Sequence, residues 1–409
     1  MSARPESLGF SSARLRRIEP FLQQRYLDAG KLPCAQMLIA RRGEVIFQSV
    51  QGWADVERKR PLTEDALFRI YSMTKPITSI AFMMLVEEGL VALDDPVHRH
   101  IPEWKNIGVY ASGEYGSFRA TPTAQPMRMV DLMRHTSGLT YGFQMRSPVD
   151  AAHRALKLGD LFKGPSLDET VRLMANIPLE FSPGSAWNYS MSTDVLGYLV
   201  GKLSGMPFEQ FLRERILGPL QMNDTDFFAP ADKASRLTAC YTATPEQRMA
   251  LQDDPQASPY LNPPKFISGG GGLLSTAADY LRFARMLLNG GELDGVRLIS
   301  PKTIQLMTRN HLPGNQDLPQ MSRSMFSEAT YNGLGFGLGF AVAIDQPRTL
   351  ILGSDGDYFW GGMASTLFWV DPAEQVIGIF LTQLMPSSAY AVRRELRTLT
   401  YAAMTESYL

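Results

Sequence analysis

Segments with the pattern of β-strands stand near both ends of the chain, and mostly helical segments lie between them. Near the start, Cys34–Arg41 and Glu44–Val50 are apolar runs around an Arg-Gly pair, which predicts a β-hairpin. Three further strands are expected near the other end, at Gly335–Ile344, Ala364–Val370 and Gln375–Leu384. If strands from both ends share one sheet, the chain forms a discontinuous α/β domain with a helical insertion.

The expected helices have apolar residues at helical spacing and recognisable end signals. The first spans 12–29 before Gly30, and another spans 72–88 and ends at Gly89. The others are Met129–Arg134, 167–176, Thr193–Leu203, Phe208–Leu217, Ala277–Leu288, a start at Ser300-Pro301, and 387–404. Three stretches without periodicity are expected to be loops: about 110–126, 242–266 and 311–332.

The composition narrows the class of protein. The 409 residues carry 40 Lys and Arg against 41 Asp and Glu, so the formal net charge is -1. A near-neutral chain without a basic run gives no electrostatic reason to expect nucleic acid or a membrane surface as partner. Two cysteines and no CxxC pattern predict neither a disulfide framework nor a metal site, and no cofactor is expected.

The start of the chain is charged and lacks the apolar core of a secretory signal. No apolar run reaches the length of about 18 residues that a transmembrane helix needs. These features predict a cytoplasmic protein, with export as the alternative, because a trimmed signal would leave the same sequence.

A candidate nucleophile stands at the start of the helix predicted at 72–88. Ser72 and Lys75 form an S-x-x-K pattern, which places both side chains on one helix face. A serine hydroxyl needs a base to become a nucleophile, and a lysine one turn away can assist. The pattern is short, and a polar first turn of a helix is the ordinary alternative.

A Ser-His-Asp hydrolase is less favoured. The G-x-S-x-G pattern of that class is absent, and none of the five histidines stands in a recognisable catalytic or metal motif. His135 is more readily a core or helix C-terminal residue. Gly269–Gly272 is a tight glycine run without the remainder of a phosphate-binding loop.

Two further segments are conspicuous. Tyr189 precedes the helix predicted at Thr193–Leu203, where a packing role is more common than catalysis. Trp360-Gly361-Gly362 is expected just before a strand. Paired glycines let a backbone approach a ligand closely, although a simple turn would also use them.

The order of these pieces resembles the serine β-lactamase and penicillin-binding-protein superfamily. Ser72-x-x-Lys75, then Tyr189-Ser190-Met191, then Trp360-Gly361-Gly362 is similar to the family VIII carboxylesterases, which are themselves similar to class C β-lactamases. The resemblance extends over most of the chain and includes Leu93–Val97, Leu132–Leu139 and Gly272–Leu288.

The resemblance implies an α/β plus α fold, with an antiparallel sheet flanked by helices and an all-helical domain. Residues 1–75 and 263–409 would form the mixed α/β domain, 76–262 would form the mainly helical domain, and the site would lie between them. No metal is implied.

The resemblance also assigns roles to site residues. Ser72 would form the acyl-enzyme, and Lys75 with Tyr189 would act as the general base, with the proton acceptor left open between them. The backbone N–H groups of Ser72 and Met363 would form the oxyanion hole. Trp360, Gly361, Gly362 and Met191 would line the substrate pocket. Aromatic residues expected around that pocket are Tyr141, Phe143, Tyr331, Phe336 and Tyr358.

Two departures from class C β-lactamases set the expected substrate. Met191 replaces the asparagine of the Tyr-x-Asn motif, and Trp360 replaces the lysine of Lys-Thr-Gly. The first removes an amide that could hold an acylamino group, and the second removes a cation suited to a carboxylate. The sequence therefore favours a small-molecule substrate and predicts hydrolysis of short- to medium-chain esters. A β-lactamase or D-alanyl peptidase, an acyltransferase, and a non-catalytic binding scaffold are the alternatives, and the oligomeric state stays open.

Overall fold

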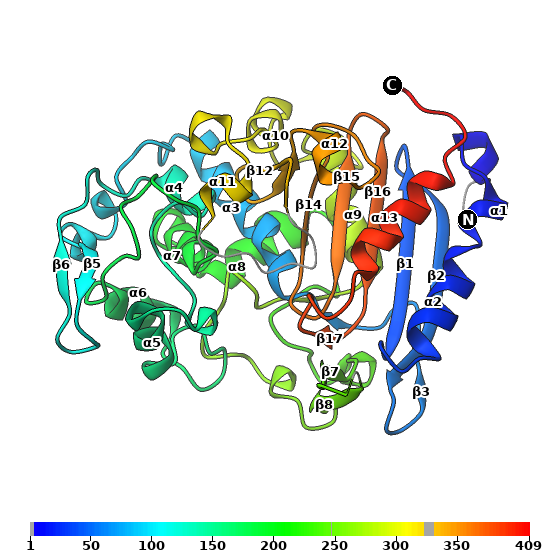
Figure 1. Ribbon diagram of the computed structural model, residues 1–409, viewed down its shortest axis with the longest axis horizontal. Coiled ribbons are helices and arrows are strands. Elements are labelled where there is room, and N and C mark those ends of the chain that lie inside the picture. Colours follow the sequence, from blue (N-terminus) through cyan, green and yellow to red (C-terminus); the bar gives the residue numbers. More distant parts are fainter. Residues whose placement is uncertain (1–3, 247, 323–330) are drawn as a thin grey trace.

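The large sheet joins the two ends of the chain. The structure is a computed structural model that describes residues 4–246, 248–322 and 331–409 (Figure 1). Its eight-stranded sheet has the order β12-β13-β14-β15-β16-β1-β2-β3, and β16 pairs antiparallel with β1. The strands are β1 Cys34–Arg41, β2 Glu44–Asp55, β3 Arg60–Pro61, β12 Leu334–Phe336, β13 Ala341–Ala343, β14 Tyr358–Gly361, β15 Leu367–Asp371 and β16 Val376–Leu381. The predicted antiparallel sheet is confirmed.

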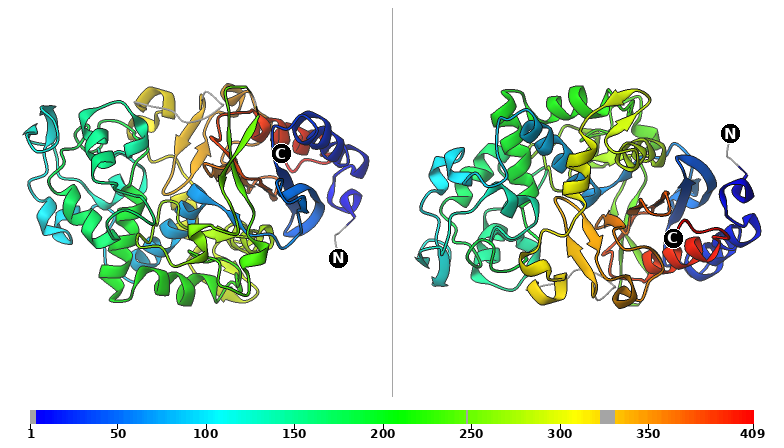
Figure 2. Two further views of the ribbon diagram at one scale, coloured as in Figure 1. Left: turned by 90° about the horizontal axis from the view of Figure 1, so that it is seen from below. Right: turned by 90° about the horizontal axis from the view of Figure 1, so that it is seen from above.

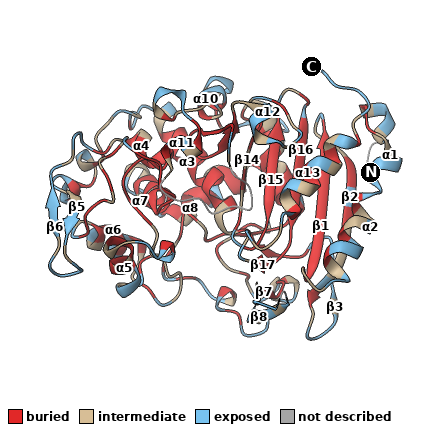
Figure 3. Cartoon of the chain, in the orientation of Figure 1, coloured by how far each residue is buried: buried red, intermediate tan, exposed pale blue. Residues whose placement is uncertain are grey.

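The first hairpin is also confirmed. β1 pairs with β2, and the turn closes with Arg41 opposite Glu44. Met37 and Ile39 face one hydrophobic core, whereas Leu38 and Ala40 face another. This alternation follows the two-residue period of a strand, so β1 is buried on both faces (Figure 3).

Helices from both termini cover the outer face of the sheet. These are α1 Ser12–Leu15, α2 Ile18–Leu22 and α13 Val392–Ala402, and Figure 2 places both termini at this end of the molecule. The single helix expected at 12–29 is wrong, because α1, α2 and a π-helical turn at Gln23–Leu27 replace it. Pro20 has no N–H to bond to the carbonyl of Arg16, which interrupts a continuous helix.

The inner face of the sheet packs on α9 (Ala277–Leu288), and α3 (Thr74–Glu87) lies in the middle of the molecule. From Thr74 to Leu85, every residue of α3 is buried. The helices beyond it are α4 Met129–Met133, α5 Pro148–Ala155, α6 Leu167–Met174, α7 Ser192–Ser204 and α8 Phe208–Leu212. Of these, α7 makes the broadest contact with α3. The described residues also include three short helices, α10 Pro301–Met307, α11 Leu318–Met321 and α12 Gln346–Thr349.

Several expected loops and strands need correction. The stretch 110–126 includes most of the hairpin β5–β6 (Val109–Ser112, Arg119–Thr121), and 242–266 includes much of β7–β8 (Cys240–Ala243, Met249–Asp253). All four strands are short, and β6 and most of β8 are exposed, so they lack the alternation that marks a strand in the sequence (Figure 3). The single strand expected at Gly335–Ile344 is two strands, since the chain turns at Gly339 with φ +99°. Part of the expected loop at 311–332 lies outside the described residues.

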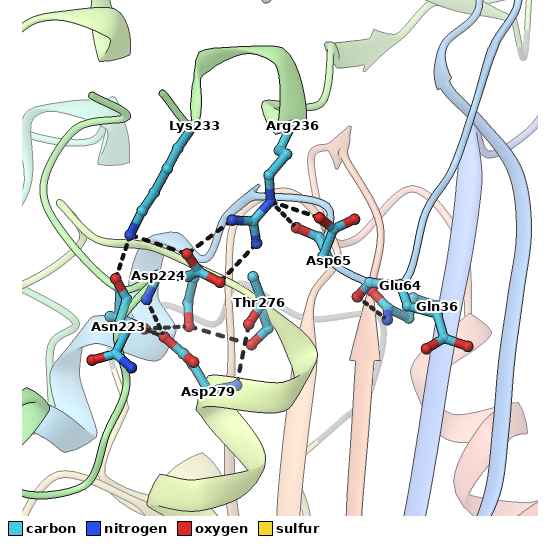
Figure 4. A network of polar contacts seen from close by, with 11 residues as sticks. Gln36, Glu64, Asp65, Asn223, Asp224, Lys233, Arg236, Thr276 and Asp279 are labelled. Atoms are coloured by element: carbon cyan, nitrogen blue, oxygen red, sulfur yellow. Dashed lines mark hydrogen bonds and ion pairs between the residues drawn. The ribbon is translucent and has the colours of Figure 1, made fainter. Parts of the chain in front are cut away.

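A polar network ties the middle of the chain to the α/β part (Figure 4). Arg236 forms ion pairs with Asp224 and Asp65. The backbone N–H of Asp224 donates to Asp279 in the first turn of α9. Asp65 precedes β4 (Phe68–Arg69), the strand that leads to Ser72 and pairs with β9 (Leu274–Ser275). The network therefore braces the segment before the candidate nucleophile.

We keep the division into 1–75 with 263–409 and 76–262 as a proposal. Backbone pairing crosses this boundary, since β7 pairs with β17 (Leu384–Met385) of the C-terminal part.

In the described residues, no helix combines the length and apolar character needed to cross a bilayer.

Candidate active site

Ser72 sits at the entrance to the buried central helix. A one-turn 3-10 helix, Tyr71–Met73, runs directly into α3 and carries the serine. Tyr71 has φ +43°, a left-handed conformation that non-glycine residues rarely adopt. Such strain is found mainly where the surroundings impose it, and functional sites are common among those places.

Lys75 lies one turn further on and reaches back to the serine. Its side chain is almost fully buried, and its Nζ is 3.3 Å from Ser72 Oγ and 2.6 Å from the carbonyl oxygen of Gly270. The same Nζ lies 4.5 Å from the ring centroid of Tyr189 and 5.3 Å from that of Tyr141. The Lys75 Nζ therefore has a carbonyl oxygen and two aromatic rings as its near neighbours.

Tyr189 comes to the same place from the segment before α7. Its hydroxyl oxygen accepts a hydrogen bond from Trp360 Nε1 over 3.3 Å. Trp360 belongs to β14, opposite Phe368 of β15. Three segments far apart in the sequence thus bring Ser72, Lys75, Tyr189 and Trp360 together.

Asp194 is a buried charge that the sequence analysis missed. It lies in the first turn of α7 and accepts hydrogen bonds from Ser268 Oγ at 2.5 Å and from the backbone N–H of Gly270 at 2.9 Å. The hydroxyl of Tyr141 donates to its other oxygen over 3.3 Å. Burial raises the pKa of the Asp194 carboxyl, while the positive charge of Lys75 opposes that rise.

Asp194 holds the backbone segment that accepts from Lys75. A Cβ added at Gly270 would lie 2.6 Å from Asp194 Oδ2, so the close approach requires glycine. Two signals could have indicated the contact: an acidic residue in the first turn of a helix soon after Tyr189, and the glycine run 269–272.

Met363 lies in the turn after β14, beside the segment that leads to Ser72. A Cβ added at Gly362 would be 2.4 Å from the carbonyl oxygen of Ile70, so only glycine allows the two segments to meet. Within the described residues, neither the Ser72 N–H nor the Met363 N–H has a hydrogen-bond acceptor. Two free donors are therefore present near the candidate nucleophile.

The Trp-Gly-Gly segment stands at the end of one strand and before the next. Trp360 and Gly361 are themselves the last residues of β14, and the strand expected after them is β15. β13 pairs only with Tyr358 and Phe359, so the side of β14 that faces β13 is unpaired from Trp360 onwards. The open edge stands where a ligand would reach the backbone.

A cavity of about 890 Å³ opens onto these groups. Ser72, Tyr189, Trp360, Gly361, Gly362 and Met363 all line it. Its wall also includes the aromatic and aliphatic side chains of Tyr141, Phe143, Leu158, Leu161, Trp187, Tyr331 and Leu334. The lining is mostly apolar, as in pockets that take small organic molecules.

Three of the expected pocket residues lie elsewhere. Met191 is fully buried and is not part of the cavity wall. It packs behind Gly159, and Gly159 does line the cavity. Phe336 lies behind the wall with its ring 5.4 Å from that of Trp360. Tyr358 packs in the core against Phe340, at a ring distance of 5.1 Å.

His135 is a core residue, as expected. Its ring lies 5.1 Å from that of Tyr189, and its Nδ1 is 3.2 Å from Ser190 Oγ. Burial, with a smaller contribution from the charge of Lys75, holds its pKa well below the usual value. A neutral imidazole therefore supports Tyr189 from behind. Among the described side chains, no group of three or more His, Cys, Asp or Glu could hold a metal ion.

The chain is similar to known proteins in sequence and in fold. The family model described as Beta-lactamase matches residues 18–402. Protein Rv1367c of Mycobacterium tuberculosis H37Rv is 37% identical over 362 residues, which cover 88% of each chain. Esterase EstB of Burkholderia gladioli is 30% identical over 370 residues, which cover 86% of each chain. The solved structure of EstCE1, titled a hydrolase with promiscuous acyltransferase activity, has a TM-score of 0.79 at 24% identity and covers 98% of this chain and 99% of that one.

Proposed function

Since the chain belongs to the β-lactamase family and has the fold of its serine hydrolases, we propose that it is a family VIII-type carboxylesterase acting on short- to medium-chain esters. The observation that carries the proposal is the set formed by Ser72, Lys75 and Tyr189 at an apolar cavity, with Trp360 bound to the tyrosine. Esterase EstB is a relative whose name states an esterase activity.

In the proposed reaction, Ser72 Oγ attacks the ester carbonyl carbon and loses its proton to the Lys75–Tyr189 pair. Lys75 Nζ lies close to Ser72 Oγ, to the rings of Tyr141 and Tyr189, and to the Asp194 carboxyl. To accept the proton, the pair must hold one deprotonated group, either a Lys75 amine or a Tyr189 phenolate, and the other member then stabilises it by hydrogen bonding or charge. The leaving alcohol takes the proton, and water releases the acid by the same route.

The oxyanion of the tetrahedral intermediate would be held by the free N–H groups of Ser72 and Met363. One such donor typically contributes about 3–4 kcal/mol to the transition state. Both groups are backbone atoms, so their placement depends on the tight contact of Gly362 with Ile70.

Trp360 supports an ester rather than a β-lactam as substrate. Its indole donates to Tyr189 without bringing a positive charge, and its ring forms part of the cavity wall. A neutral acyl group fits this wall better than the carboxylate that penicillins carry.

Acyl transfer is a second candidate. The acyl-enzyme is common to both reactions, and a cavity of about 890 Å³ can hold an acyl group together with an alcohol acceptor. Adding a primary alcohol to the assay separates the two, since a transferase would release the new ester faster than the acid.

The proposal is tested by turnover of p-nitrophenyl butyrate and of benzylpenicillin, with the protein and with Ser72→Ala. We expect butyrate hydrolysis that needs Ser72 and little penicillin turnover. Faster clearance of penicillin than of butyrate would instead indicate a β-lactamase.

A further inference from the structure

An arginine from the C-terminal helix lies behind the turn that carries Met363. Arg393, the second residue of α13, donates from Nη2 to the carbonyl oxygen of Gly362. Its Nε lies 3.5 Å from the carbonyl oxygen of Ser365 at the other end of the turn. A Cβ added at Gly361 would lie 2.8 Å from the guanidinium carbon, so the arginine packs directly on the end of β14.

The carbonyl that accepts from Arg393 belongs to the same peptide group as the Met363 N–H. A peptide group is planar and trans, so its C=O and N–H point in opposite directions. A donor fixed on the Gly362 oxygen therefore fixes the direction of the Met363 N–H. Because the donor is a cation, it also draws electron density toward the oxygen and makes the N–H a stronger donor.

The other oxyanion donor lacks this arrangement. The Ser72 N–H belongs to the peptide group whose carbonyl is that of Tyr71. This carbonyl accepts a hydrogen bond from the neutral backbone N–H of Thr74. One turn beyond Arg393, the guanidinium of Arg397 is paired with buried Asp357 and supports the sheet instead. Of the two peptide groups that carry the proposed oxyanion donors, the Gly362–Met363 peptide is therefore the one whose carbonyl accepts from a charged side chain.

We propose that Arg393 is a positioning residue for the oxyanion hole. It holds and polarises the 362–363 peptide so that the Met363 N–H binds the negative oxygen of the tetrahedral intermediate. The inference rests on the proposed esterase function and adds a charged component behind one donor. Because this bond strengthens only as the oxyanion forms, its loss lowers kcat more than it changes KM.

The test compares Arg393→Gln and Arg393→Lys on two p-nitrophenyl esters, the neutral butyrate and the monoester of glutaric acid, which carries a carboxylate. For Arg393→Gln we expect kcat to fall about 10- to 100-fold on both esters, with KM changed less than about twofold. Arg393→Lys keeps the charge but only one point of contact, and should recover part of kcat.

Two results would overturn the proposal. One is an unchanged kcat in Arg393→Gln. The other is a loss confined to the glutarate ester and expressed as a higher KM, which would make Arg393 a binding site for a substrate anion, since it also lines the cavity.

Arg297→Gln is the matched control. Arg297 also donates to two backbone carbonyls, those of Gly290 and Ile299, but it lies outside the cavity wall. Its kcat should be unchanged. Ser72→Ala separates the two proposals: turnover that survives Ser72→Ala refutes the esterase mechanism, whereas turnover that needs Ser72 but ignores Arg393 refutes only this inference.

Discussion

The indole N–H of Trp360 donates a hydrogen bond to the hydroxyl oxygen of Tyr189 over 3.3 Å. Because that oxygen accepts from the indole, its own proton is directed elsewhere, and any negative charge that develops on it is stabilised. The ammonium of Lys75 lies 4.5 Å from the centre of the same ring. Tyr189 is thus flanked by a neutral donor on one side and a cation on the other.

Trp360→Phe should keep the apolar wall and lose the donor. We expect kcat for p-nitrophenyl butyrate to fall roughly tenfold, in line with the net value of one neutral hydrogen bond, with little change in KM. Trp53→Phe, at an exposed position outside the cavity wall, is the control and should behave like the parent protein. Equal kcat values for the two variants would show that the indole bond has no catalytic role.

Trp360→Lys tests the substrate argument. A lysine at this position supplies the cation that a penicillin carboxylate would bind, so we expect faster acylation by benzylpenicillin and slower ester turnover. The rate of penicilloyl adduct formation, followed by mass spectrometry, measures the first effect. An unchanged acylation rate would mean that something other than Trp360 excludes β-lactams.

Asp194→Asn should weaken the contacts around Lys75 while keeping a side chain of the same size in place. The variant keeps an acceptor oxygen but removes the negative charge near Lys75 and one acceptor for Gly270 or Tyr141. We expect kcat to fall about 10- to 100-fold, since charge-assisted bonds are worth roughly twice neutral ones. Asp131→Asn changes a buried first-turn aspartate of α4 instead and should leave kcat unchanged if the protein stays folded. Similar losses in both variants would contradict a specific role.

Phe143→Ala should change acyl-chain preference. The ring of Phe143 stacks on that of Tyr141 at 4.8 Å, lines the cavity and is 44% exposed, so its removal widens the mouth with little cost to the core. We expect the ratio of kcat/KM for p-nitrophenyl octanoate over butyrate to rise roughly fivefold or more. A ratio equal to that of the parent protein would place the acyl chain elsewhere in the cavity.

Acid should destabilise the fold through buried histidine. Burial lowers the pKa of His153 from 6.5 to about 4, so the folded state holds the neutral ring. Between these two values the unfolded chain binds the extra proton, and stability therefore falls as the pH falls from about 6.5 to about 4. Urea unfolding of the protein and of His153→Gln at several pH values measures the effect. The variant should show a shallower dependence on pH, and identical slopes would refute the assignment.

The sequence predicted the parts of the molecule where local pattern and packing agree. The β1–β2 hairpin and α3 have strong apolar patterns because the core buries them on nearly all sides. The β5–β6 hairpin was missed since it is exposed and is defined by backbone pairing alone. The first helix was predicted as continuous, because its apolar spacing outweighed the hydrogen bond that Pro20 cannot make to Arg16.

The sequence indicated some residues of the candidate site and missed others. Ser72, Lys75 and Tyr189 belong to short motifs with a known order, so resemblance indicated them. Asp194 and Arg393 have no such motif, and each acts through backbone groups that only the fold brings near: Gly270 for one and Gly362 for the other. Met191 was placed in the pocket by its motif position, whereas the turn into α7 directs it into the core.

The most direct test of this mechanism is to label the nucleophilic serine covalently. The protein is labelled with a fluorophosphonate, digested and mapped by mass spectrometry, in parallel with Ser72→Ala and with a sample protected by excess p-nitrophenyl butyrate. We expect one label on Ser72, no label in Ser72→Ala, and slower labelling under substrate protection. A label on another serine, or ester turnover that persists in Ser72→Ala, would contradict it.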